Sequence, residues 1–510
     1  MKLECIDIKH DKFLFENYFK STSELLNKDN KVKYAQYYTG KDIAIYMANM
    51  FKKLNKKVVR ILDPGCGMGM LTAAFLDRLI KINNRKIEKV IITMYEIDRH
   101  VIEVLQTNMN KISEECQNNG LEIEYSIVNQ NYIQSFSNKD ELKFKEKFDY
   151  VIMNPPYMKI IDNSEDDIRL ESLDINVTNY YAAFISLSIR LLVEGGELVA
   201  ITPRSFCNGA YFKEFRKDLI NNMVFDKIHL FESRKELFKD DDVLQENIIF
   251  HCIKRKAKMK DKIQIIHSYS NLKDGLTMEK KAIDDVIYPN DENLLIRIMR
   301  GEEEEKITRK IDSLECTLDD LDIKVSTGPV VDFREPEETL SIERKDNAIP
   351  YFFPEHISIN GIEWPKTQSK KCNYIILNEK NKSKMRHNGN YVLLKRITSK
   401  EERRRIVSVV CEGNNFDYEF FAFDNKLNYL HRNKRGLPME IAKGITLYLN
   451  STILDRYFRT FSGNTQVNAT DLRSLKYPTE RQLIRLADRY DEVFNSQELI
   501  DNAVEEILFN

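Results

Sequence analysis

Four consecutive residues, Asn154-Pro155-Pro156-Tyr157, combine a side-chain amide, constrained backbone carbonyls and an aromatic ring. They follow the apolar run 148–153, which predicts a buried strand that two prolines must end, because proline cannot donate to a sheet ladder. The Asn154 and Pro155 carbonyls can accept both hydrogens of an NH2 group, while the Tyr157 ring stacks on the group that carries it. The stretch predicts a site for a planar amine, and its alternative is a strand end followed by a surface tyrosine.

A second chemical signal lies upstream of this tetrapeptide. The run 58–62 predicts a buried strand, a glycine turn begins at Asp63, and a helical pattern covers 71–76. Strand, glycine turn and helix open a nucleotide-binding α/β unit, because glycines let the backbone approach a ligand closely. The next predicted strand, 89–95, ends in Glu96, whose carboxylate can accept from two ribose hydroxyls. A phosphate-binding loop is disfavoured because no Gly-Lys-Ser/Thr follows the glycines.

The elements that must position these residues alternate between strand and helix patterns from residue 34 to about 255. Such alternation predicts a Rossmann-like, doubly wound and largely parallel sheet, so the fold class is α/β. The sequence further predicts a polar helical extension over 1–33, a charged connector over 256–310, a mixed α+β domain over 311–480 and a final helix over 481–510. Within the mixed domain, 438–457 has a helical pattern interrupted by Gly444.

Together these motifs resemble the gamma class of DNA adenine-N6 methyltransferases, in which the cofactor motif precedes NPPY and a long C-terminal region follows. The resemblance covers about residues 34–255 and implies S-adenosylmethionine as cofactor. Gly40 stands where the family usually has proline, and Asn131 where it usually has aspartate. The residues that would bind the cofactor are Tyr38, Thr39, Asp63, Pro64, Gly65, Cys66, Gly67, Glu96, Ile97, Asn131, Tyr132 and Asn154.

The same resemblance implies a mechanism. A target adenine would leave the double helix and lie between Tyr157 and Phe212, at an unstacking cost of about a few kcal/mol. Asn154 and the Pro155 carbonyl would accept the two hydrogens of its amine, with Pro156 and Tyr157 completing the catalytic motif. Alignment for in-line methyl transfer is then the main contribution of the protein, and neither a metal nor a covalent intermediate is required.

The long C-terminal region predicts a target-recognition domain, because NPPY can contact only the flipped base and neighbouring bases must be read elsewhere. The segment 326–334 resembles one that opens such domains in the family. Basic residues could contact phosphates and amides could pair with base edges; an ordinary solvated face and a structural turn are the competing interpretations. The residues expected to bind DNA are Lys395, Arg396, Arg403, Arg404, Arg405, Asn464, Gln466 and Asn468.

Composition is consistent with a cytoplasmic enzyme, and the net charge counts only weakly against the double-stranded DNA substrate that the resemblance implies, because local charge distribution governs DNA binding. The 510 residues carry a net charge of −2, and 42% of them are hydrophobic, which supports a packed core. Eight cysteines form no CxxC pair, so the sequence indicates neither a zinc site nor a disulfide framework, and no apolar run is long enough to span a membrane.

Several functions are compatible with these motifs. The chain could be the modification enzyme beside a separate cognate restriction endonuclease, or an orphan methylase. A glutamine-N5 protein methyltransferase uses the same NPPY motif, but it would not explain the long C-terminal region. Cytosine-N4 methylation is chemically close, although NPPY in this motif order favours adenine. The intact NPPY and glycine turn argue against a catalytically silent DNA-recognition subunit.

Overall fold

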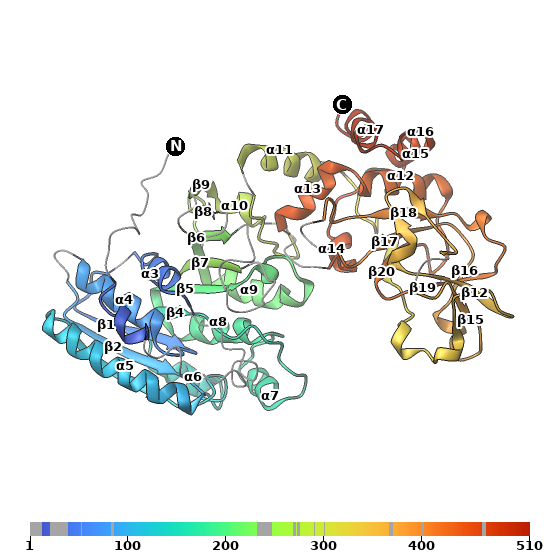
Figure 1. The fold of residues 1–510 in the computed structure, drawn as a ribbon. Helices are drawn as coiled ribbons and strands as arrows, with labels where there is room; N and C mark the ends of the chain where they lie inside the picture. Colours follow the sequence, from blue (N-terminus) through green and yellow to red (C-terminus); the bar gives the residue numbers. More distant parts are fainter. Residues whose placement is uncertain are drawn as a thin grey trace. The chain divides into compact units, whose positions relative to one another are not determined.

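The chain folds into two compact units, Met1–Arg297 and Ile298–Asn510. A computed structural model describes residues 13–20, 39–52, 54–82, 86–231, 247–268, 272, 276–289, 291–299, 301–366, 371–398, 402–461 and 466–510 (Figure 1). Each unit is described by itself below.

The first unit is built on a nine-stranded sheet with the strand order β3-β2-β1-β4-β5-β7-β6-β8-β9. The five strands β1 to β5 pair in parallel, whereas β7 pairs antiparallel with both β5 and β6. This arrangement confirms the predicted α/β class with a largely parallel, doubly wound sheet. The strands are β1 (Val58–Pro64), β2 (Lys89–Tyr95), β3 (Glu122–Val128), β4 (Phe148–Met153), β5 (Leu192–Pro203), β6 (Met223–Phe231), β7 (Asn247–Lys254), β8 (Lys262–Ser268) and β9 (Thr277–Ala282).

Helices bury the central strands of this sheet. All six residues of β4 are buried, as expected for a strand whose two faces are both covered. Residues of α3, α4 and α5 share one apolar core with β1 and β2, and α8 packs with α6, α9 and β5. The helices are α1 (Glu16–Lys20), α3 (Lys41–Ala48), α4 (Met70–Lys81), α5 (Arg99–Asn118), α6 (Lys139–Phe144), α7 (Glu165–Ser172), α8 (Tyr180–Leu191), α9 (Lys213–Asn222) and α10 (Ile283–Val286).

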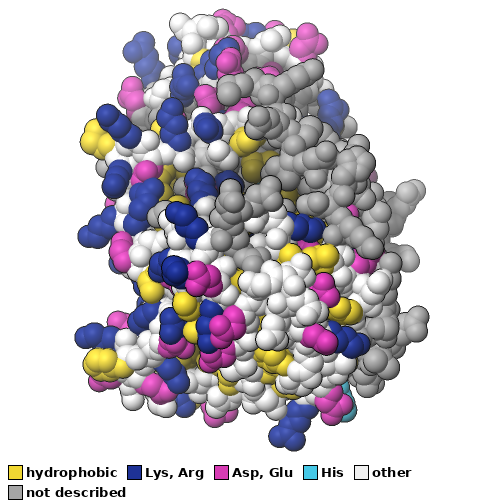
Figure 2. Space-filling model, turned by 90° about the vertical axis from the view of Figure 1, so that its left-hand side faces the viewer, with side chains coloured by type: hydrophobic (Ala, Val, Ile, Leu, Met, Phe, Trp, Pro, Cys, Tyr) yellow, Lys and Arg dark blue, Asp and Glu magenta, His cyan; other side chains and the backbone are white. Residues whose placement is uncertain are grey.

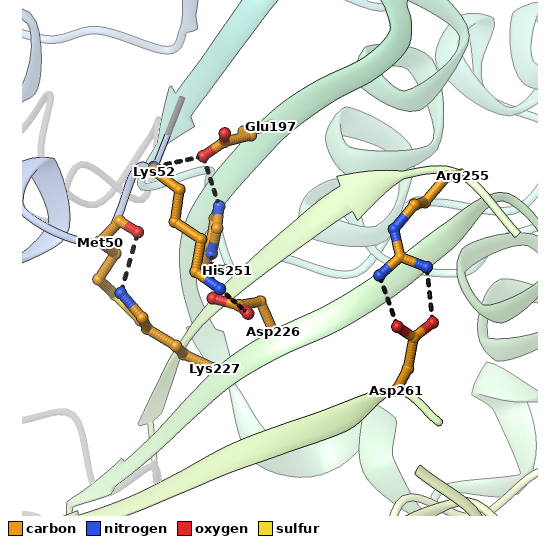
Figure 3. A network of polar contacts seen from close by, with 8 residues as sticks. All are labelled: Met50, Lys52, Glu197, Asp226, Lys227, His251, Arg255 and Asp261. Carbon is orange, nitrogen blue, oxygen red and sulfur yellow. Dashed lines mark hydrogen bonds and ion pairs between the residues drawn. The ribbon is translucent and has the colours of Figure 1, made fainter. Parts of the chain in front are cut away.

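An ionic cluster ties the segment after α3 to three strands (Figure 3). His251 on β7 lies between two carboxylates, with 2.8 Å from its Nε2 to Glu197 Oε2 and 3.0 Å from its Nδ1 to Asp226 Oδ2. The backbone N–H of Lys52 donates to Glu197 Oε2 at 2.7 Å, and its ammonium pairs with Asp226. Burial opposes ionisation of Asp226, but hydrogen bonds from His251 and Lys52 lower its pKa to about 2. The cluster therefore fixes the C-terminal end of the α3 segment on the sheet.

The predicted boundary of the catalytic domain at residue 255 is wrong. Strands β8 and β9 lie inside the predicted connector, yet β8 pairs in parallel with β6 and extends the same sheet. Lys and Asp around 256–262 suggested a solvated linker, whereas Ile263, Ile265 and Ile266 are buried in the sheet. The rest of the connector is divided too, because α11 (Gly301–Asp312) belongs to the second unit and packs on α13.

The second unit contains a four-stranded sheet, β10-β20-β17-β18, a five-stranded sheet, β11-β15-β12-β19-β16, and the pair β13-β14. Mixed short strands and helices confirm the predicted α+β character. Its strands are β10 (Lys324–Thr327), β11 (Leu340–Ser341), β12 (Ala348–Phe352), β13 (Ile357–Ser358), β14 (Gly361–Ile362), β15 (Tyr374–Ile376), β16 (Arg386–His387), β17 (Tyr391–Lys395), β18 (Ser408–Cys411), β19 (Phe420–Phe423) and β20 (Leu427–His431).

The C-terminal helices differ from the single predicted helix over 481–510. Asp488 ends α15, and a separate short helix precedes α17. Gly444 does not interrupt its helix: it lies inside α12, where an added Cβ would come 2.1 Å from the Leu483 carbonyl oxygen. This glycine allows α12 to approach α15. The helices are α12 (Met439–Leu449), α13 (Thr452–Phe461), α14 (Ala469–Arg473), α15 (Glu480–Ala487), α16 (Tyr490–Val493) and α17 (Gln497–Leu508).

Surface charges on the face drawn in Figure 2 are mixed in sign, with lysine and arginine side chains interspersed among aspartate and glutamate. Within the described ranges, no helix combines the length and apolar character needed to cross a bilayer. No group of three or more histidine, cysteine, aspartate or glutamate side chains in that part of the chain could hold a metal ion.

Candidate active site

Three polar residues predicted from separate motifs meet at one edge of the first sheet. Asp63 lies near the end of β1, Glu96 follows β2, and Asn154 follows β4. The strands are parallel neighbours in register, with Leu62 opposite Val151 and Pro64 opposite Tyr95, so their carboxyl ends coincide. Ligands of open α/β sheets bind at this edge.

The glycine turn after β1 is folded over the end of β2. The backbone N–H groups of Gly65 and Cys66 both donate to the Tyr95 carbonyl, at 2.9 and 3.0 Å. Gly65 and Gly67 have φ of 74° and 54°, the left-handed region that glycine adopts without steric cost. The turn therefore brings bare backbone close to Glu96, as the sequence predicts for a nucleotide-binding turn.

Asp63 is a fully buried carboxyl group at the base of this turn. Its Oδ2 accepts a hydrogen bond of 2.7 Å from the Thr72 hydroxyl on α4. Its Oδ1 has no hydrogen-bond partner among the described residues. Burial raises the pKa of Asp63 to about 7, against the hydrogen bonds from Thr72 that lower it. One buried acceptor is thus available to a ligand donor, and a cationic donor would compensate its charge best.

Glu96 is held at the end of β2 by three backbone donors. Its Oε1 accepts from the N–H groups of Ile97 and Asp98 at 2.8 and 2.9 Å, and its Oε2 accepts from Gly67 at 3.0 Å. Burial raises the pKa of this carboxyl group, and the three N–H groups oppose that shift. With about four lone-pair sites on a carboxylate, at least one acceptor direction remains for a ligand hydroxyl. Ile97 beside it is 43% exposed.

The NPPY segment follows β4 and places Asn154 between two hydroxyl groups. The Tyr157 hydroxyl donates to Asn154 Oδ1 at 2.9 Å, and Asn154 Nδ2 donates to Thr39 Oγ1 at 3.1 Å. Asn154, Pro156 and Tyr157 are half-buried, and Pro155 is buried. The Asn154 amide is therefore held in place at the carboxyl end of β4. A carbonyl oxygen has two lone pairs, so the Tyr157 hydroxyl does not by itself prevent Asn154 from accepting from an amine.

Tyr181 on α8 is an aromatic side chain that sequence reasoning missed. Its ring stacks on Phe212 with centroids 5.5 Å apart, and it meets Tyr157 edge-on at 6.4 Å. Phe212 is 7% exposed, so much of its ring is already covered. The structure thus brings Tyr157 and Phe212 into one aromatic group through Tyr181. The only sequence signal was the Tyr180-Tyr181 pair at the start of a helical pattern.

Asn131 and Tyr132, both expected to bind the cofactor, differ in their burial. Asn131 is half-buried, and its amide contacts Asp166, a residue that no motif indicated. Tyr132 is 2% exposed, and its hydroxyl oxygen lies 3.0 Å from the Ser188 hydroxyl oxygen. Its ring is therefore part of the buried core. Cys66 is also buried, and burial raises the pKa of its thiol, so it is a packing residue of the glycine turn.

Two predicted site residues, Tyr38 and Asn464, lie outside the described residues. In the second unit, Gln466 accepts a hydrogen bond of 3.3 Å from the Arg396 guanidinium, which also donates to the Asn425 carbonyl at 3.0 Å. Asn468 is the N-cap residue of α14, and its backbone N–H donates to Asp471 at 3.0 Å. These contacts give a structural role to residues predicted to read bases.

The prediction that Arg405 contacts DNA is wrong, because this residue is completely buried. Its backbone N–H donates to Asp455 at 2.6 Å, its Nε donates to Thr398 at 3.3 Å, and its guanidinium lies 5.7 Å from the Phe458 ring centroid. Arg404 is half-buried, and burial lowers its pKa. Of the three consecutive arginines only Arg403 is exposed, while Lys395 is half-buried.

Comparisons with known proteins identify relatives of this chain. The Eco57I restriction-modification methylase family matches residues 79–238. The chain is 38% identical to the type II methyltransferase M.PstI of Providencia stuartii over 501 residues, covering 97% of each chain. It is 39% identical to the type II methyltransferase M.BsuBI of Bacillus subtilis over 489 residues, covering 94% of this chain and 95% of that protein.

Two solved structures share the fold at low sequence identity. The ATP-dependent type ISP restriction-modification enzyme LlaBIII bound to DNA matches with a TM-score of 0.50 and 12% identity, over 93% of this chain and 40% of that one. A nuclease-deletion mutant of the type ISP enzyme LlaGI in complex with a DNA substrate mimic matches with the same TM-score, over 90% and 55%.

Proposed function

The chain belongs to the type II restriction-modification DNA methyltransferases, and from this premise we propose that it methylates the N6 amine of an adenine at one specific DNA sequence. The observation that carries the proposal is Asn154, held between Thr39 and Tyr157 beside Asp63 and Glu96. A half-buried amide acceptor next to an aromatic ring suits a planar aromatic amine better than an aliphatic one.

Methyltransferases of this class use S-adenosylmethionine, whose sulfonium supplies an already activated methyl group. The residues at the sheet edge fit this cofactor. Asp63 Oδ1, buried and without a partner in the described chain, suits the cofactor's cationic methionine end. Glu96 would accept from ribose hydroxyls, and the backbone of the glycine turn leaves room for close approach. Thr39 lies at the start of the α3 segment, within hydrogen-bond distance of Asn154.

Asn154 would act on the target amine by accepting its hydrogens. The lone pair of an adenine amine is delocalised into the ring, which makes the nitrogen a poor nucleophile. Hydrogen bonds to the Asn154 and Pro155 carbonyls favour a more pyramidal nitrogen and aim its lone pair at the methyl group. Holding both reactants in this geometry accounts for most of the acceleration, since well-oriented groups gain about 7–11 kcal/mol over free encounter.

Tyr157 would hold the flipped base by stacking. Its hydroxyl bond to Asn154 fixes the ring, and the ring meets Tyr181 edge-on, which in turn stacks on Phe212. Stacking on an aromatic side chain contributes about 1–3 kcal/mol per base, which offsets the cost of unstacking. The second unit would recognise the DNA sequence, and a separate restriction endonuclease would cut the same site.

Mapping of modified bases tests this proposal directly. The chain is expressed in a host without DNA methylation, and the host DNA is read by single-molecule sequencing. We expect N6-methyladenine at every copy of one short sequence, and none with Asn154→Ala. Modified cytosine, or unmodified DNA from a chain that methylates a protein glutamine in vitro, would contradict the adenine assignment.

A further inference from the structure

Asp166 on α7 is a buried carboxylate that accepts hydrogen bonds on both of its oxygens. It is 6% exposed. Asn131 Nδ2 lies 3.0 Å from its Oδ1 and 3.2 Å from its Oδ2, Gln134 Nε2 lies 2.9 Å from Oδ1, and the Tyr180 hydroxyl lies 2.6 Å from Oδ2. These four contacts use the lone-pair directions of both oxygens, so Asp166 has little capacity left to bind a ligand itself.

The contacts of Asn131 determine which way its amide points. A carboxylate can only accept, so the group facing Asp166 must be the amide NH2. A backbone N–H can only donate, so the group that faces Ile133 N at 2.9 Å must be the carbonyl oxygen. Both ends of the amide are therefore assigned by partners with a single possible role, and rotation by 180° would lose both hydrogen bonds.

The Asn131 turn lies next to the residues proposed to hold the nucleoside. Asn129 Nδ2 donates to the carbonyls of Glu96 and Ile97, at 3.1 and 3.2 Å. This pairing fastens the turn to the end of β2. A carbonyl presented here lies near the base attached to a ribose that Glu96 would bind.

We propose that Asp166 is a positioning residue that fixes the Asn131 carbonyl as the acceptor for the exocyclic amine of the cofactor's adenine. Ile133 occupies one lone pair of that oxygen, which leaves the second for the ligand amine. The bidentate bond to a carboxylate also increases the electron density on the amide oxygen, since linked hydrogen bonds polarise one another. The proposal rests on the cofactor site described above, and Asp166 gives that site its selectivity for an adenine base.

Asp166 also connects this turn to the segment that follows NPPY. The Tyr180 hydroxyl binds Asp166, and the Tyr180 N–H donates to the Met158 carbonyl at 3.0 Å. Met158 is the residue after Tyr157. One buried carboxylate thus links the Asn131 turn on the proposed cofactor side to the segment after Tyr157 on the proposed target-base side.

The test compares two ligands that differ only at the amine. S-adenosylhomocysteine carries the donor NH2, whereas its 6-deaminated purine analogue carries only a hydrogen at that position. Their affinities for the full chain are measured by calorimetry, without any methyl transfer. In Asp166→Asn the new amide can donate as well as accept, so only the Ile133 N–H still favours one orientation of the Asn131 amide. We expect discrimination between the two ligands to fall about tenfold, the value of roughly one hydrogen bond.

A reciprocal exchange makes the test independent of general damage to the fold. Asn131→Asp alone places two carboxylates about 3 Å apart and should weaken binding of both ligands. The double variant Asn131→Asp with Asp166→Asn restores one donor facing one acceptor and should recover at least half of the discrimination. Asp167→Asn is the matched control, because Asp167 is the next residue on α7 and accepts from Asn163 N at 2.8 Å.

Each result separates the positioning role from the cofactor site. If Asp166→Asn keeps the wild-type discrimination, or if the exchange does not recover it, Asp166 only stabilises the fold. If Asn131→Ala keeps full affinity for S-adenosylhomocysteine, Asn131 does not bind the adenine and the inference fails at its base. Mapped N6-methyladenine would leave the proposed function intact in either case.

Discussion

The two units differ in how closely the sequence spacing of their polar residues matches the positions of those residues in the fold. In the first unit, Asp63, Glu96 and Asn154 are far apart in the sequence and lie together at one sheet edge. In the second unit, Arg403, Arg404 and Arg405 are consecutive and are separated by burial. Proximity in sequence was therefore the poorer guide to a shared site.

The difference has a physical cause. Parallel strands must end at the same edge, so a polar residue after each strand is carried to a common place by the backbone alone. A run of charges carries no such constraint, and each side chain takes whatever partner the packing offers. Arg405 shows this best, because a buried aspartate and a ring in its own unit already contact it. A functional assignment is thus stronger where topology, rather than composition, brings residues together.

The largest effect should come from the sheet edge. We expect Asn154→Ala to slow methyl transfer about 1000-fold at saturating cofactor and DNA, or ~4 kcal/mol in the barrier, because the amine loses a fixed acceptor. Single-turnover rates measure it, and calorimetry reports any loss of cofactor affinity separately. Asn110→Ala on the exposed side of α5 is the control. Activity within about tenfold of wild type would remove Asn154 from the catalytic group.

Arg405 should affect stability rather than DNA binding. Arg405→Ala removes a buried side chain from Thr398 and Phe458, so we expect the free energy of unfolding to fall by about 3 kcal/mol. Urea unfolding followed by fluorescence measures this loss. The folded variant should keep the wild-type salt dependence of DNA binding. A changed salt slope with unchanged stability would restore Arg405 as a phosphate contact.

A smaller effect is expected from the titration of Asp63. Burial raises its pKa to about 7, so the carboxyl group is mostly protonated at pH 6 and mostly ionised at pH 8. A cationic ligand prefers the ionised form, so cofactor affinity should rise about tenfold over this range and binding should release a proton. Calorimetry in buffers of different ionisation enthalpy measures both.

The carboxyl group also affects folding, with the opposite sign. Its folded pKa lies above the unfolded value of 3.8, so the folded state binds more protons between about pH 4 and 7, and stability should decline as pH rises through this window. Asp63→Asn should abolish both pH dependences. If the variant keeps them, another group titrates at the site.

The smallest effect should come from Arg403, the exposed member of the arginine run. Arg403→Ala should weaken binding to all DNA sequences alike and reduce the slope of log K against log salt by about one. Filter binding to cognate and scrambled duplexes at several salt concentrations measures both. An unchanged slope would mean that Arg403 is an ordinary solvated residue. Neither Arg403 nor the buried Arg405 would then contact DNA.

Much of the first unit could be predicted from the sequence, but one domain boundary and one glycine of the second unit could not. Apolar runs identified β1, β2 and β4, with a glycine turn after β1 and two prolines after β4 as clear end signals. Only β4 is buried along its whole length, as expected for a strand covered on both faces. The boundary at 255 failed because charges beside β8 concealed its buried isoleucines. The sequence predicts a helix break at Gly444, whereas close packing of α12 on α15 explains the glycine.

Residues that act through another side chain were the hardest to predict. Asp166 lies in a run of acidic residues that sequence alone assigns to a solvated helix face, and only three-dimensional contacts show it buried against Asn131. Tyr181 lies in an apolar helix, and the sequence pattern of that helix indicates only a face buried in the core. The roles proposed for Asn154, Glu96 and Asn131 remain predictions that the experiments above test.

The position of β7 has a consequence for synthesis of the chain. This strand lies between β5 and β6 in the sheet, although the ribosome makes it after both. Until residue 254 has emerged, β5 and β6 each present an unpaired edge, which is the state most exposed to wrong pairing. Since distant pairings also fold slowly, we expect a nascent chain to need chaperone protection about halfway through translation, after the residues of its methyl-transfer motif have been made.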